Sequence, residues 1–236
     1  MNKLKYLLPI RSILFVLIFI VGAAITGREL AAISNWWSIV ATVVNFITIL
    51  VIILAAKKLK TSYAKIISYE KGKTRKRQVV AISAIVLLVG TLGMYLAGWL
   101  CYGKLPYASP MMIAPIPAAL AIINFVALPV TVAFAEDALY LGCGVNQIKN
   151  KAAAILVPAF FYALQHSFIP TLLDVKYIIY RFLSFLPLTI VLCWHYQKHR
   201  NPVPIMVGHA LIEVASVVMI LITSLSPEFY NIITSL

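Results

Sequence analysis

The length of the apolar runs is the feature that most constrains this chain. Segments 36–56 and 79–101, for example, contain no charged residue at all. A helix rises about 1.5 Å per residue and the hydrocarbon of a bilayer is about 30 Å thick, so about 20 such residues cross it. The alternating segments of about ten residues that are typical of membrane strands are absent. The sequence therefore predicts an all-α bundle of transmembrane helices in a lipid bilayer.

Composition excludes a soluble globular domain. Hydrophobic residues make up 62% of the chain and charged residues 11%, against about 25% charged residues in ordinary soluble domains. The apolar runs predict about seven spans (six to eight), near 8–27, 36–56, 79–101, 111–141, 152–168, 177–196 and 202–224. No internal repeat divides the chain, and we expect a single membrane domain over residues 1–236.

The basic residues give the bundle an orientation. The net charge is +13, and most of the 20 Lys and Arg residues, Arg11 among them, lie on one side of the membrane if the seven spans alternate. The positive-inside rule makes this side cytoplasmic. We therefore expect a multi-pass protein of the bacterial cell (inner) membrane with a cytoplasmic N-terminus. No nucleic-acid-binding motif accompanies the charge, so nucleic acid is not expected as a partner.

Two segments allow a second interpretation. Segment 8–27 resembles a signal peptide, with a basic lead, an apolar run and small residues at Gly22, Ala23 and Ala24. We expect it to be retained as the first helix. Segment 57–77 is strongly basic and holds a single acid, Glu70. It is a cytoplasmic loop that sets the topology, or it lies as a helix on anionic lipid.

Acids and histidines well inside the predicted spans are few. They are Glu136 and Asp137 in the fourth span, His166 in the fifth, and His209 and Glu213 in the seventh. Because such groups cost several kcal/mol in lipid, they usually face the bundle interior and mark a functional site. A carboxylate and two histidines from three helices suffice to activate a water molecule, with the carboxylate as general base. Hydrolysis is therefore the reaction class that the sequence favours.

Three short motifs carry a resemblance to a known family. The segment Ala135–Gly142 resembles the pattern E-E-x-x-x-R-G, Tyr162–His166 resembles F-x-x-x-H, and His209–Glu213 resembles H-x-x-x-N/D. In this order and spacing the motifs are similar to those of the CPBP family, the CAAX proteases and bacteriocin-processing enzymes also called abi proteins. The similarity covers about residues 110–224, which we expect to form the protease core.

The resemblance implies an intramembrane endopeptidase. Glu136 would be the general base that activates water, and His166 and His209 would position the water or bind a metal. Asp137 and Glu213 would support these three residues. Family members are described as metalloproteases, and Glu136, His166, His209 and Glu213 together offer two nitrogens and two carboxylates, a donor set suited to Zn²⁺ with a water molecule.

Three residues depart from the family pattern. Asp137 replaces the second glutamate, Leu141 replaces the arginine, and Glu213 stands where asparagine or aspartate is expected. Without the arginine a buried carboxylate needs another cation or a proton, and Arg181 is the intramembrane candidate. An ionised Glu213 cannot donate a hydrogen bond to an oxyanion, so we expect it to be protonated or to bind a metal.

Our leading hypothesis is hydrolysis of a peptide bond in a small peptide or a lipid-modified substrate. A second hypothesis is a catalytically silent relative that acts as an immunity or partner-binding membrane protein, which the loss of the arginine at Leu141 favours. A third is an ion-coupled transporter in which the same acids and histidines form a relay. Each polar residue could also be a structural group bonded across helices.

Overall fold

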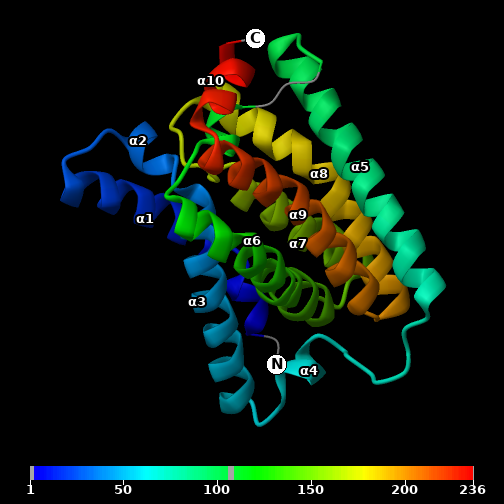
Figure 1. The fold of residues 1–236 in the computed structure, drawn as a ribbon. Helices are drawn as coiled ribbons and strands as arrows, with labels where there is room; N and C mark the ends of the chain where they lie inside the picture. The colour runs from blue at the N-terminus through cyan, green and yellow to red at the C-terminus, as the bar shows by residue number, and fades with distance from the viewer. Residues whose placement is uncertain (1–2, 106–108, 236) are drawn as a thin grey trace.

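A computed structural model gives the structure of residues 3–105 and 109–235. Within these ranges the regular structure is helical and no strand occurs (Figure 1). The long helices are α1 (Ile10–Thr26), α3 (Trp37–Lys58), α5 (Lys76–Tyr102), α6 (Ala118–Val132), α7 (Lys151–His166), α8 (Val175–His199) and α9 (Val203–Leu225). The shorter helices are η1 (Leu4–Leu7), α2 (Leu30–Ser34), α4 (Tyr63–Ile66), η2 (Pro110–Ile113), η4 (Val145–Gln147) and α10 (Pro227–Ser235).

Six helical segments are long and apolar enough to cross a membrane. They are Leu4–Thr26, Trp37–Lys58, Lys76–Tyr102, Ala118–Gln147, Val175–His199 and Val203–Leu225. Helix α7 adds a seventh, shorter helix of 16 residues. The predicted all-α polytopic bundle of six to eight spans is confirmed. The fourth span begins later than predicted, at Ala118, because Pro115 and Pro117 lack the backbone N–H that a helix interior requires.

The helices from α5 to α9 pack closely around the centre of the bundle. Helix α8 packs against α5 and α7, and α9 lies against both α5 and α6 (Figure 1). Small residues permit this approach. A Cβ atom at Gly93 of α5 would lie 2.5 Å from the carbonyl oxygen of Ser184 in α8. A Cβ atom at Gly208 of α9 would lie 3.1 Å from the Cα atom of Ser83 in α5. The helix backbones are therefore nearly in contact along these two seams.

Helix α6 continues directly into a π-helix, η3 (Ala133–Gly144). Hydrogen bonds in a π-helix join residues i and i+5, so each turn holds more residues than an α-helical turn and advances less along the axis per residue. The sequence analysis assumed an α-helix here and missed this change. Single turns of π-helix are often found at functional sites, and η3 carries the first motif.

The middle of the basic segment 57–77 is docked onto the bundle. Ile66 and Ile67 are buried, and the side-chain amide of Asn146 donates a hydrogen bond of 2.8 Å to the carbonyl oxygen of Ile66. Gly142 leaves room for this contact, since a Cβ atom there would lie 3.1 Å from the same oxygen. The segment therefore closes the end of η3 through its apolar residues.

Candidate active site

The acids and histidines of the three motifs meet in the interior of the bundle. Glu136 and Asp137 project from η3, His166 is the last residue of α7, and His209 lies in the second turn of α9. All four are buried, with exposed fractions of 1–5%. One carboxylate oxygen of Glu136, Oε2, lies 3.6 Å from Nε2 of His166 and 3.9 Å from Nε2 of His209. The structure thus brings one carboxylate oxygen to both imidazoles.

His209 lies close to the start of its helix, although it meets Glu136. His209 lies only two turns from the start of α9 at Val203, whereas an α-helical fourth span would place Glu136 much deeper below its inner end. The π-helix η3 reduces this difference. Because a π-helix advances less per residue, Glu136 lies nearer to the end of its span than an α-helix would put it, and α9 reaches it from its second turn.

Asp137 and Tyr162 hold the far side of the His209 ring. The hydroxyl of Tyr162 donates to Oδ1 of Asp137 at 2.9 Å and lies 2.9 Å from Nδ1 of His209. The direct separation between Nδ1 of His209 and Oδ2 of Asp137 is longer, at 3.4 Å. The tyrosine hydroxyl therefore bridges the short aspartate and the imidazole. This arrangement orients Nε2 of His209 toward Glu136.

Glu136 forms an ion pair with Arg11, a residue that the sequence analysis did not select. The guanidinium Nη2 of Arg11 lies 2.7 Å from Oε1 of Glu136, and both side chains are almost completely buried. Arg11 had been counted among the topology-setting charges, and Arg181 had been named as the replacement for the missing arginine. In the structure Arg11 of α1, and not Arg181, provides the cation next to Glu136, and the Arg11 side chain is buried in the bundle.

Gln165 and Thr48 complete the surroundings of Glu136 and Arg11. The side-chain amide of Gln165 donates to Oε2 of Glu136 at 2.6 Å. Arg11 donates through Nε to Oε1 of Gln165 and through Nη1 to the hydroxyl of Thr48 at 3.0 Å. Each carboxylate oxygen of Glu136 thus accepts a short hydrogen bond, and the charge-assisted bond to Arg11 belongs to the stronger class of such bonds.

A cavity of about 250 Å³ reaches the site from one side. Glu136, His166, Arg181 and Glu213 line it, whereas His209 is not part of its wall. Arg181 also donates through Nε to the backbone carbonyl oxygen of His166 at 3.2 Å. Side chains that line the cavity therefore include two carboxylates, one imidazole and one guanidinium.

Glu213 reaches this cavity one turn after His209 on α9. In the part of the chain that the structure describes, Glu213 forms no ion pair with His166 or His209. The structure places Glu213 on the cavity wall, which Arg181 also lines.

The donor set does not present a metal site in this arrangement. Among the described residues, no group of three or more His, Cys, Asp or Glu side chains is placed to hold a metal ion. Both oxygens of Glu136 already accept hydrogen bonds, from Arg11 at 2.7 Å and Gln165 at 2.6 Å. A guanidinium at this distance would also repel a divalent cation. The Zn²⁺ ligand set therefore stays a prediction from sequence.

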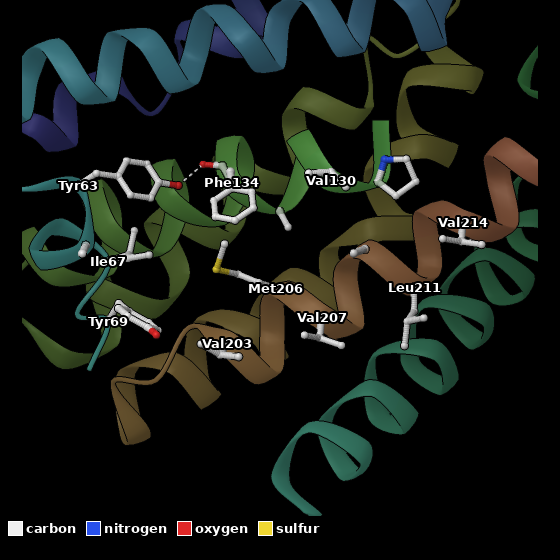
Figure 2. Close-up of a pocket in the computed structure, with 14 residues that line it drawn as sticks. Tyr63, Ile67, Tyr69, Val130, Phe134, Val203, Met206, Val207, Leu211 and Val214 are labelled. Carbon is white, nitrogen blue, oxygen red and sulfur yellow. Dashed lines mark hydrogen bonds between the residues drawn. The ribbon is translucent and has the colours of Figure 1, made fainter. Parts of the chain in front are cut away.

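A larger, apolar groove lies between α6 and α9, as Figure 2 shows. Its volume is about 610 Å³, and its walls include Val130 and Phe134 on one side and Met206 and Leu211 on the other. Residues of the basic segment close one end. There the hydroxyl of Tyr63 donates to the carbonyl oxygen of Phe134 at 2.5 Å, and burial raises the pKa of Tyr63, which keeps this donor protonated.

Comparison with known proteins agrees with the motifs. A family model described as type II CAAX prenyl endopeptidase Rce1-like matches residues 118–215. The match covers less than half of the chain and shows that these residues are similar to the CPBP family. The matched region contains η3, α7, α8 and the first half of α9, which carry the acids, the histidines and Arg181. Arg11 lies outside it. Searches of curated proteins and of solved structures return no match.

Proposed function

We propose that the protein is an intramembrane endopeptidase that hydrolyses a peptide bond with water activated by Glu136. The observation that carries this proposal is the position of Glu136, which lines the cavity and whose Oε2 lies within 3.9 Å of two imidazole Nε2 atoms. The similarity of residues 118–215 to a family that is named for a prenyl endopeptidase supports the same chemistry.

The residues of the site have complementary roles in this reaction. Glu136 accepts a proton from water while the resulting hydroxide attacks the carbonyl carbon of the peptide, and the proton then passes to the leaving amine. His166, 3.6 Å from Oε2 of Glu136, positions the water. His209 is held in place by Asp137 and Tyr162, and it supports the carboxylate of Glu136. General-base catalysis of this kind contributes roughly 10²–10⁴-fold to a rate.

Arg181 is our candidate for the group that stabilises the oxyanion. The third motif of the family has asparagine or aspartate at the position of Glu213, and an ionised Glu213 offers no donor. Arg181 lines the same cavity as Glu136 and Glu213 and carries five N–H donors in a fixed geometry. Donors aimed at the developing negative charge are often the largest single contribution to catalysis of acyl transfer.

The substrate that we propose is a small peptide or a lipid-modified peptide. The apolar groove of Figure 2 supports the second class, because about 610 Å³ of apolar space on α6 and α9 would accommodate a hydrocarbon chain. Val132 and Glu213 of the catalytic cavity adjoin Ala133 and Val214 of the groove in sequence. A chain held in the groove would therefore lie directly beside the site.

A catalytically silent immunity or partner-binding protein is less well supported. Its main support in the sequence is Leu141 in the place of the motif arginine. With Arg11 placed 2.7 Å from Glu136, the carboxylate has a cation in spite of that substitution.

For the location we propose the inner membrane of a bacterium with a cytoplasmic N-terminus, on the basis of the basic segments alone.

Cleavage of unmodified and lipidated peptides by purified protein in nanodiscs tests the proposal. We expect the wild type to cut at least one peptide class, and we expect Glu136→Gln and His166→Ala to lose the activity. Glu70→Gln is the matched control, because Glu70 pairs with Lys73 on the surface, 65% exposed. Equal activity of Glu136→Gln and wild type, or no cleavage of any peptide by a folded wild type, would contradict the proposal.

A further inference from the structure

Glu136 is a buried carboxylate whose only ion-pair partner with a permanent charge, among the described residues, is Arg11. A carboxylate in the bundle interior is strongly destabilised unless it is paired. Arg11 is 0% exposed although it lies in the second residue position of α1, next to the basic N-terminal lead. An arginine with this position and no functional partner would extend toward the water interface, so its inward orientation requires an explanation.

The hydrogen-bond geometry shows that Arg11 fixes both oxygens of Glu136. Its Nη2 donates to Oε1 of Glu136 directly. Its Nε donates to Oε1 of Gln165, which also accepts from the hydroxyl of Tyr140 at 3.1 Å. Because a guanidinium can only donate and a carboxylate can only accept, the amide of Gln165 must present its oxygen to Arg11 and its nitrogen to Glu136. The second hydrogen bond to Glu136 therefore also depends on Arg11.

We propose that Arg11 is the positioning residue that pairs with Glu136 and holds it in the orientation needed for catalysis, in place of the arginine that the family motif has at Leu141. Arg11 does not line the catalytic cavity, so it acts through Glu136 and does not touch the substrate. Helix α1, which lies outside the family-matched residues 118–215, is then part of the catalytic machinery. The inference rests on the proposed hydrolase function for its kinetic part only.

The kinetic test compares Arg11→Met and Arg11→Lys with the control Arg28→Met. Arg28 is exposed at the other end of α1, so its loss should leave kcat unchanged. A displacement of about 1 Å in a catalytic group costs roughly 10²-fold, and we expect Arg11→Met to lower kcat by about this factor while KM stays within about twofold. Arg11→Lys keeps the positive charge but lacks the planar set of N–H donors of arginine. Its kcat should therefore fall between those of wild type and Arg11→Met.

A stability cycle tests the pairing without any activity assay. Arg11→Met should lower the melting temperature in detergent because it leaves the Glu136 charge unpaired, and Arg11→Met/Glu136→Gln should recover part of the loss. Additive effects in this cycle, or a kcat of Arg11→Met within about threefold of wild type, would overturn the inference. If Arg11→Met does not fold, Arg11→Lys is judged by the same kinetic criterion. If the cycle shows coupling between Arg11 and Glu136 but the wild type cuts no peptide, the proposed function is rejected and the Arg11–Glu136 pairing stands.

Discussion

The bridging hydroxyl of Tyr162 leads to a sharp prediction about Asp137 and His209. Tyr162→Phe removes one oxygen and preserves the ring, which is buried and stacked on Tyr140 at a centroid distance of 4.3 Å. The lost interactions are 2.9 Å contacts to Oδ1 of Asp137 and to Nδ1 of His209. Hydrogen bonds to charged groups contribute about 1.5–3 kcal/mol. Since about 1.36 kcal/mol corresponds to a tenfold change in rate, kcat should fall by roughly 10- to 10²-fold.

The double variant Tyr162→Phe/Asp137→Glu provides the structural check on this reasoning. The family pattern has phenylalanine at the position of Tyr162 and glutamate at that of Asp137, and the longer glutamate would span the 3.4 Å gap between Asp137 and His209 without a bridge. We therefore expect the second substitution to restore part of kcat. The measurement is kcat for peptide cleavage in nanodiscs together with the melting temperature of each variant.

Tyr196→Phe is the matched control. Tyr196 is also a buried tyrosine, and its hydroxyl accepts a hydrogen bond of 2.7 Å from Asn146, away from the catalytic cavity. Its loss should lower the melting temperature but not kcat. If Tyr162→Phe changes kcat no more than Tyr196→Phe does, the hydroxyl does not orient His209 and the reasoning is refuted.

Three other predictions concern packing, substrate binding and metal. Gly93→Ala should lower the melting temperature, because its Cβ atom would lie 2.5 Å from the carbonyl oxygen of Ser184 and overpacking costs about 1–3 kcal/mol; an unchanged value would show that α5 and α8 separate easily. Ala210→Phe should fill the apolar groove and slow cleavage of lipidated peptides but not of unmodified ones, and equal slowing of both would contradict a hydrocarbon site. Chelators should leave the cleavage rate unchanged, and a loss restored by added Zn²⁺ would show that the Glu136 surroundings rearrange around a metal.

The sequence was sufficient to predict the helical membrane fold and to select the side chains that meet at its centre. Length and apolarity identify a transmembrane helix without reference to its neighbours, so the spans follow directly. The rarity of charge in lipid selected Glu136, Asp137, His166 and His209, which the structure places within hydrogen-bonding or ion-pair distance of one another. Their roles in catalysis stay predictions.

Arg11 was missed because position in the sequence does not reveal the direction of a side chain. It follows Lys3 and Lys5, and a basic residue near the start of the first span usually marks the cytoplasmic boundary. A signal was present, since the loss of arginine at Leu141 required another buried cation. Choosing between Arg11 and Arg181 needed the packing of α1 against α7, which depends on contacts more than 150 residues apart in the chain, such as that between Arg11 and Gln165.

The origin of Arg11 in α1 has a consequence for the evolution of such sites. The cation is separated from Glu136 by 125 residues, so a lineage can lose the arginine of the first motif if it gains one on a neighbouring helix. Arginines at the positions equivalent to 11 and 141 should then exclude each other among related chains. A search that demands the motif arginine would classify members of this kind as inactive, although the charge of the site has only changed its place in the sequence.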